Sequence, residues 1–244
     1  MVKYENLANP PIQEALIDFR VRLRSSSKDD FAKLSAVLSD RYQEGKEILL
    51  FNATFNLKDG QASSDHQSNF VGFRFESKAN NFVFQAQSEG FTLSKLKPYR
   101  DWIELLAEAK RVWAIYRELL NPLSVERIAC RYINRFEADS NVFDFSDYFT
   151  APPEVPKILP QGVSRYLLQL EVPAPNADAT VVVTQALEGV TSAPAAFVLD
   201  IDVFKVKSYE MQDEAWWDDL EQLRDLKNQF FFESLTKKTK DMFK

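Results

Sequence analysis

The residue types on which catalysis most often depends are scarce in this chain. It contains one histidine, His66, and one cysteine, Cys130. A site with two histidines or several cysteines cannot form within the chain, and Ser-His or Cys-His catalysis would depend on His66 alone. His66 lies in a polar stretch, residues 58–69, that is typical of a flexible loop, and Cys130 lies in an apolar, strand-like run. We therefore expect a solvated histidine and a buried, inert thiol.

Two acids are better placed to do chemistry. Asp200 and Asp202 alternate with apolar residues, so they project from one face of a predicted strand. Two carboxylates on one face can bind a divalent cation, which suggests a metal-dependent hydrolase or nuclease. The alternative, which we favour, is that both acids pair with basic residues on neighbouring strands. The six glycines are too far apart for a phosphate-binding loop, and no cofactor is expected.

Arginines recur at even spacing on predicted strands, and they form the sharpest pattern in the sequence. Their planar guanidinium groups suit the recognition of phosphate or carboxylate, so the sheet could bind an anion or nucleic acid. The candidate anion-binding residues are Arg20, Arg22, Arg24, Arg74, Arg131, Arg135 and Arg165. The favoured alternative is a cross-strand ladder of ion pairs. The acids whose spacing suits such a ladder are Asp18, Glu76, Glu171, Asp200 and Asp202.

Adjacent aromatic residues mark two places in the predicted last helix. Trp216 precedes Trp217, and Phe230 precedes Phe231 and Phe232. Neighbours on a helix point about 100° apart, so these rings cannot all face one core. Trp217, Phe231 and Phe232 are therefore candidates for contact with a second copy of the chain or with another protein.

The elements expected to position these residues form an α+β protein, a single domain made of two similar halves, 1–121 and 122–244. Alternating apolar residues predict the strands, and apolar residues three and four apart predict the helices. Ser27 is a predicted helix N-cap, and Asp101 begins a long helix with Glu104 in position for a capping box. The first half is expected to contain strands 15–24, 48–57, 70–76, 81–87 and 91–96, with helices 28–42 and 101–120. The second is expected to contain strands 124–137, 163–172, 179–188 and 196–207, a short helix at 143–149, an extended connector at 151–162 and a helix at 213–235.

The order of elements in the first half, β-α-β-β-β-β-α, resembles one repeat of the TATA-binding-protein-like fold. That resemblance implies one joined antiparallel sheet with two long helices on one face, and it implies no shared function. The composition, 45% hydrophobic and 13% aromatic residues, supplies enough apolar material for such a core. The net charge of −6 argues against wholesale binding to nucleic acid or to an anionic membrane, although a basic patch would leave nucleic acid open. Without a signal peptide or membrane span, the cytoplasm is the expected location.

Three segments together carry a second resemblance. They are Asn9-Pro10-Pro11-Ile12-Gln13-Glu14-Ala15-Leu16, Arg131-Tyr132-Ile133-Asn134-Arg135 and Asn228-Gln229-Phe230-Phe231-Phe232-Glu233-Ser234-Leu235-Thr236. Their order and spacing are similar to those of a sporadically distributed family of uncharacterised bacterial proteins of comparable length. That family has an N-x-P-I-x-E-A start, an R-Y-x-N-R strand and an F-F-x-x-x-T closing helix. The resemblance implies no activity, cofactor or catalytic residue, and the scattered distribution suggests an accessory or defence-like role beside a neighbouring gene product.

Three functions follow as hypotheses from the sequence. The first is a non-enzymatic binding or accessory protein with a protein partner or a second copy of itself. The second is an anion or nucleic-acid binder that uses the arginine face. The third is a metal-dependent hydrolase or nuclease that uses Asp200 and Asp202.

Overall fold

The protein is described by a computed structural model, which describes residues 4, 7–24, 27–58, 61–140, 143–188 and 195–244. Within these ranges, only the backbone of residues 53–58 and 61–66 is described. These residues form nine strands and four α-helices. The strands are β1 (Ile12–Arg22), β2 (Lys46–Lys58), β3 (Gln61–Glu76), β4 (Phe82–Gln87), β5 (Gly90–Leu96), β6 (Ser124–Glu137), β7 (Tyr166–Ala174), β8 (Ala179–Glu188) and β9 (Ala196–Glu210). The helices are α1 (Lys28–Leu38), α2 (Trp102–Leu120), α3 (Trp216–Ser234) and α4 (Lys237–Asp241), with single 3-10 turns at η1 (Phe145–Asp147) and η2 (Pro175–Ala177).

All nine strands join one antiparallel sheet, in the order β2-β3-β4-β5-β1-β6-β9-β8-β7. β1 and β6 lie at the centre of the sheet, where they pair with each other and Ile17 stands opposite Cys130. The α+β class and the large antiparallel sheet are therefore confirmed. Strands from both parts of the chain contribute to this one sheet.

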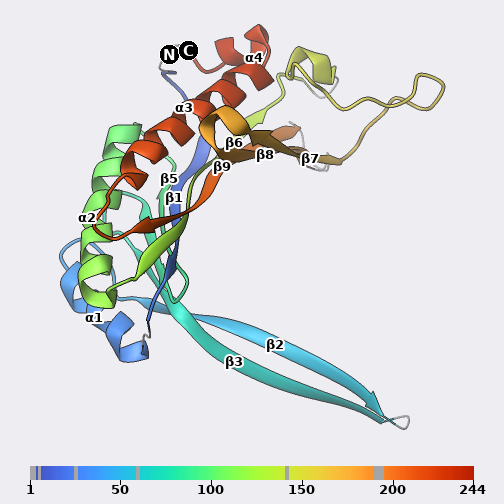
Figure 1. Cartoon of the computed structure of the whole chain (residues 1–244). Coiled ribbons are helices and arrows are strands. Elements are labelled where there is room, and N and C mark those ends of the chain that lie inside the picture. The colour runs from blue at the N-terminus through green and yellow to red at the C-terminus, as the bar shows by residue number, and fades with distance from the viewer. Residues whose placement is uncertain (1–3, 5–6, 25–26, 59–60, 141–142, 189–194) are drawn as a thin grey trace.

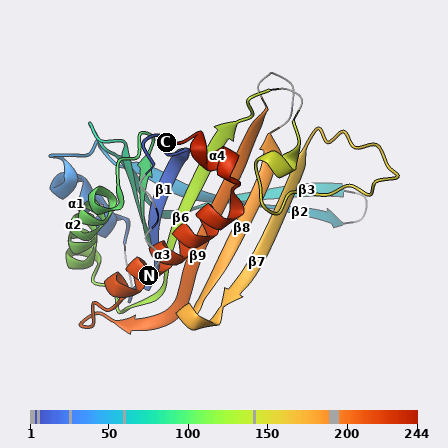
Figure 2. The ribbon, with the colours of Figure 1, turned by 90° about the horizontal axis from the view of Figure 1, so that it is seen from above.

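The helices lie on one face of the sheet, and the sheet curves away from them (Figure 1). Viewed from above, α3 crosses β6 and β9, whereas β7 and β8 carry no α-helix (Figure 2). The alternation read from β1 sets this arrangement, because Ile17, Phe19 and Val21 are buried under the helices and Arg20 and Arg22 are exposed on the other side. Both long helices share one face, as predicted. We call the opposite, helix-free side of the sheet the open face.

Aromatic rings build the core between the sheet and the helices. The Phe19 ring of β1 lies 5.0 Å from Trp113 of α2 and 5.4 Å from Trp217 of α3, measured between ring centroids. Asp101 caps α2 by accepting the Glu104 backbone N–H at 2.8 Å, as its position in the sequence indicates. The left-handed Asn121 (φ 45°) ends that helix just before Pro122.

The prediction of a loop at 58–69 is wrong. β2 continues to Lys58 and β3 starts at Gln61, so these strands pair from Leu49 opposite Phe70 out to Lys58 opposite Gln61. β3 pairs with β4 only between Gly72 and Glu76, so the outer part is a two-stranded ribbon. We call residues 49–58 and 61–70 the arm, which projects from the body of the protein (Figure 1). The polar sequence of 61–69 suits a solvated ribbon as well as a loop, which explains the misassignment.

Smaller differences concern where elements end. α1 stops at Leu38 instead of residue 42, and the closing helix stops at Ser234, after which Thr236 caps the separate α4. Arg24 follows β1 and Arg165 precedes β7, so neither lies on a strand as expected. None of the helices within the described residues has the length and apolar character needed to cross a membrane.

Candidate functional site

The centre of the open face carries a grid of ion pairs. Arg127 on β6 donates hydrogen bonds to Asp18 on β1, at 3.0 Å, and to Asp202 on β9, at 3.2 Å. Arg131, four residues further along β6, binds both carboxylate oxygens of Asp200 through its Nε atom, at 2.9 and 3.1 Å. Antiparallel register produces this pattern, because Arg131 stands opposite Asp202 and its long side chain reaches the diagonal Asp200.

All three aspartates of the grid are largely shielded from water, and Asp202, with its side chain 25% exposed, is the most open of them. Asp18 is nearly buried and also accepts a hydrogen bond from the Thr92 hydroxyl at 2.7 Å. Burial raises the pKa of Asp202, although Arg127 and Arg131 act in the opposite direction. The Arg127 guanidinium lies 4.3 Å from the centre of the Phe204 ring, which adds a cation–π contact. The grid is therefore held in place by partners on four strands.

Four of the other arginines predicted to bind anions also have acidic neighbours. Arg20 lies 3.6 Å from Asp18, Arg22 lies 3.9 Å from Glu126, and Arg74 lies 3.3 Å from Glu76. Arg135 pairs with Glu188 at 2.9 Å and with Glu137 at 3.4 Å. Arg24 and Arg165 are exposed just outside β1 and β7. The expected cross-strand pairing with arginine is therefore formed at Asp18, Asp200 and Asp202, whereas Glu76 contacts Arg74 on its own strand and Lys46 on β2.

The acids proposed as metal ligands are engaged by different arginines. Asp200 binds Arg131 and Asp202 binds Arg127. A metal ion would have to displace these guanidinium groups, since both occupy carboxylate oxygens. Within the part of the chain that the structure describes, no cluster of three or more His, Cys, Asp or Glu residues could hold a metal ion.

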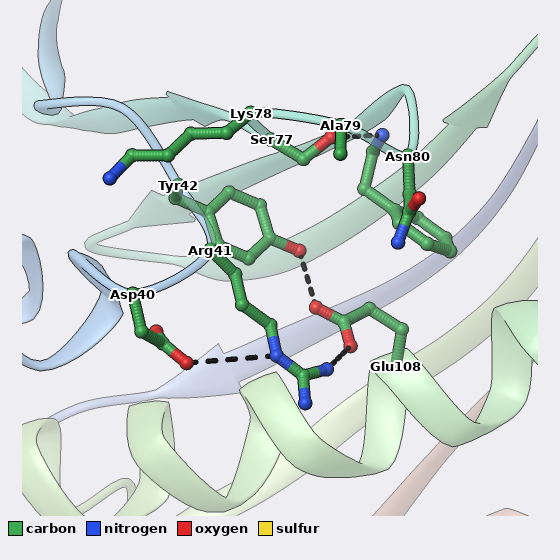
Figure 3. A pocket seen from close by; sticks show the side chains of 9 residues that line it. Asp40, Arg41, Tyr42, Ser77, Lys78, Ala79, Asn80 and Glu108 are labelled. Carbon is green, nitrogen blue, oxygen red and sulfur yellow. Dashed lines mark hydrogen bonds and ion pairs between the residues drawn. The ribbon is translucent and has the colours of Figure 1, made fainter.

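A pocket of about 210 Å³ lies on the other side of the molecule, between the turn that follows α1, the β3–β4 turn and α2 (Figure 3). The carboxylate of Glu108 on α2 forms its polar floor. It accepts hydrogen bonds from the Tyr42 hydroxyl at 2.8 Å and from Arg41 at 3.4 Å. Arg111, one turn along α2, binds both of its oxygens at 2.7 and 3.0 Å.

The role of Glu108 is structural, because its carboxylate binds Arg41, Tyr42 and Arg111. Three donor side chains occupy its oxygens, so the carboxylate has little capacity to bind a ligand. Burial, followed by the nearby Glu108 charge, raises the pKa of Tyr42, which therefore stays protonated. The pocket thus lacks a nucleophile paired with a base, and its network fastens the turn after α1 to α2.

A buried lysine lies under α3. The Lys227 Nζ atom is 3.6 Å from the centre of the Tyr132 ring on β6 and donates a hydrogen bond to Asn228 at 2.7 Å. Burial lowers the pKa of Lys227 to about 7. The Tyr132 hydroxyl is hydrogen-bonded to Tyr99 at 3.0 Å. Nearby Cys130 is buried, and burial raises the pKa of its thiol to about 12, which makes it the inert thiol that the sequence predicts.

The three segments that carry the family resemblance meet at one end of the sheet. The Arg135 N–H donates to the Pro11 carbonyl at 2.9 Å, so the opening segment extends alongside β6. The side chain of Asn134 donates to the Leu199 carbonyl of β9 at 2.9 Å. In the closing segment, Leu235 forms a β-bridge with Phe149. These residues have structural partners, and the segments join the ends of the chain to the centre of the sheet.

The predicted interface aromatics pack within the protein. Trp217 and Phe231 belong to the buried core. Phe232 is half-buried, and its ring stacks on Tyr4 with 4.6 Å between centroids. Their own packing leaves little side-chain surface for a partner.

Comparisons with known proteins give no identity: no family model matches the chain, and no curated protein is significantly similar to it. The sequence did not indicate that Lys227 and Glu108 are buried and engaged, or that Arg127 pairs with Asp18 and Asp202. Their burial and partners depend on contacts distant in the sequence, and no local motif marks them. Only the even spacing of Arg127 with Arg131 gave a signal.

Proposed function

We propose that this chain is a non-enzymatic binding or accessory protein that holds a protein partner on the open face of its sheet. One observation carries this proposal: no helix of the described residues lies over the open face, and the sheet curves away from the helices, so that its two edges extend on the side of the open face (Figure 1). Within the described residues, its central charged groups are engaged with one another. This favours recognition by a preformed surface over acid-base or metal chemistry.

The chemistry of the open face suits a protein surface better than a polyanion. Its central grid alternates in sign and sets two arginines against three aspartates, so it carries no excess of positive charge. Exposed apolar side chains accompany them, because Leu167 on β7 is 74% exposed and Val206 on β9 is 71% exposed. Protein interfaces combine apolar contacts with fixed charge pairs, whereas nucleic-acid sites need net positive charge.

The two halves are proposed to be related repeats of the TATA-binding-protein-like type. The strand order supports this idea, because β5, β4 and β3 follow outward from β1 as β9, β8 and β7 follow outward from β6. The long helices α2 and α3 then take equivalent places. The second half has no described counterpart of α1 or β2. A partner on the open face would therefore span the β1–β6 junction between unequal halves.

The test swaps the positions of the two charges of one ion pair and so keeps the pair itself. A variant with Arg131→Asp and Asp200→Arg keeps a pair on β6 and β9 but inverts its sign. The matched control inverts Arg117 and Glu214, an exposed pair at 2.8 Å on the helix side. Immobilised wild-type protein is expected to retain a stoichiometric protein from an extract of the native host, and the control swap should retain it equally well.

The open-face swap is expected to reduce retention by roughly tenfold or more, since inverted charges at an interface oppose the partner's own. Equal retention by both swaps would contradict the proposal. Salt-dependent binding of oligonucleotides that is lost in Arg22→Ala/Arg131→Ala would favour the anion-binding function instead. Metal binding lost in Asp200→Asn/Asp202→Asn would favour the hydrolase.

A further inference from the structure

We infer that the arm is a dimerisation element, in which β2 of one copy pairs antiparallel with β2 of a second copy around a two-fold axis. This inference concerns the edge of the sheet and does not depend on the function proposed for the open face. It also places the contact between copies at a site different from Trp217, Phe231 and Phe232. Four observations lead to it.

The first observation is that the arm lacks support. From Leu49 opposite Phe70 outward, β2 and β3 pair only with each other among the described strands. A two-stranded ribbon is marginal in water, and three or more strands or a covering helix are normally needed for stability. A second ribbon at the free edge of β2 would convert two strands into four.

The second observation is that the edge is unprotected. The sequence from 48 to 57 contains no charged residue and no proline, and its charges, Lys46, Glu47 and Lys58, stand at the two ends of the strand. Phe51 is 73% exposed and Leu50 is 53% exposed. Natural edge strands carry lysine, proline or bulges to prevent such pairing. The register shift between Ile48 and Leu49 lies at the base of the arm, and from Leu49 to Leu57 the strand carries none of these devices, which indicates a strand that is paired.

The third observation is the direction of the strands. Nine strands in strict antiparallel alternation leave the edge strands β2 and β7 running the same way. If a second copy extends the sheet with the same face up, β2 beside β7 of that copy would be parallel. An antiparallel contact therefore pairs an edge strand with the same strand of the second copy. This is an isologous, two-fold contact, which closes at two copies and is the commonest symmetry of soluble oligomers.

The fourth observation separates the two edges. β7 is shorter, and it carries Pro173, which has no N–H to donate to a neighbouring strand. β2 has no such block and is the edge strand of the unsupported arm. The self-pairing strand is therefore β2.

The experiment uses opposite charges at one position near the middle of the run. Phe51→Lys and Phe51→Asp each place like charges close together across the two-fold axis. Leu167→Lys is the matched control, because Leu167 is as exposed as Phe51 and lies on the other edge strand, β7. The mass of each protein is measured by light scattering over a wide concentration range, and circular dichroism checks that each variant is folded.

Wild type and Leu167→Lys are expected to have the mass of two chains. Each Phe51 variant alone should dissociate, with the dissociation constant raised by roughly tenfold or more. An equimolar mixture of Phe51→Lys and Phe51→Asp should dimerise again, because the charges then attract across the axis. Recovery in the mixture also shows that both variants are folded.

Three results would overturn the inference: a wild type that is monomeric at every concentration, Phe51 variants that remain dimeric, or a mixture that stays monomeric. A monomeric wild type whose arm binds an unrelated protein would assign the edge to that partner. A dimer that Leu167→Lys dissociates and Phe51→Lys does not would move the contact to β7.

Discussion

Lys227 is the residue whose surroundings depart most from ordinary surface chemistry. Its side chain is 8% exposed, and it faces Tyr132 and Cys130 from β6 and Arg224 and Asp225 from its own helix. Its contacts are an aromatic ring and an amide oxygen, so the charge is poorly compensated. The structure therefore stabilises the neutral amine, which explains the lowered pKa.

This environment predicts a pH-dependent stability that one substitution removes. Because the folded-state pKa is about 7 and the usual value is 10.5, the unfolded chain holds a proton between these limits that the folded chain lacks. The free energy of unfolding should therefore rise with pH from about 7 to 9, by up to about 1.4 kcal/mol per unit. Lys227→Met should flatten this dependence and raise stability near pH 7.

The measurement is urea unfolding at several pH values. Lys237→Met is the control, because Lys237 is exposed. Removing its charge should leave the dependence of the unfolding free energy on pH the same as in the wild type. A Lys227→Met variant with an unchanged slope would show that Lys227 is charged in the folded protein at neutral pH.

At the scale of elements, α3 starts without a capping side chain, since its N-cap is Ala215. Its first turn is fastened instead by Asp219, which accepts hydrogen bonds from Lys205 at 3.0 Å and Tyr209 at 2.6 Å on β9. Burial alone would raise the pKa of Asp219, but these donors lower it below the usual value. The N-terminal half of α3 is thus held to the sheet by one largely buried carboxylate.

Asp219→Ala is expected to destabilise the protein by about 3–5 kcal/mol, because it leaves Lys205 buried without its counter-charge. The double variant Lys205→Met/Asp219→Leu should recover most of that loss, since it removes both charges. Lys207→Met should cost less than about 1 kcal/mol, because Lys207 is half exposed. Urea midpoints measure all three, and a double variant as unstable as Asp219→Ala would contradict this account.

The sequence predicted elements well where local signals agreed with packing. The strand at 124–137 and the strand at 179–188 occur with the predicted bounds, and Ser27 and Asp101 cap helices as expected. The strand at 48–57 was predicted, but the outer part of β3 was missed because the polar sequence of 61–69 has no apolar alternation that would mark a strand. α4 was missed because its stripe is too short for periodicity to identify.

The same limit applies to the site. Even spacing placed Asp200 and Asp202 on one face of their strand and Arg131 and Arg135 on one face of theirs, because parity is a local property of strands. Which acid each arginine binds depends on register between strands far apart in the sequence. Thus Asp200 pairs diagonally with Arg131, and Asp202 pairs with Arg127.

At the scale of the whole molecule, one aromatic core connects the parts on either side of the β1–β6 junction. Trp113 of α2 lies 6.2 Å from Trp216 of α3, and Phe19 of β1 contacts rings from both helices. A boundary between independent domains would instead have few contacts crossing it. The two halves are therefore expected to unfold together.

This expectation is tested by removing one large ring from each half. Phe84 on β4 packs against Phe75 and Phe91, and Phe197 on β9 packs against Phe136 and Tyr148. Phe84→Ala and Phe197→Ala should each cost about 3–5 kcal/mol. Each should shift one shared transition, seen at the same midpoint by tryptophan fluorescence and far-ultraviolet circular dichroism. All chains are compared at one protein concentration, because dimerisation would add to stability. Two separate transitions, each moved by only one variant, would show that the halves are independent domains and that the junction merely joins their sheets.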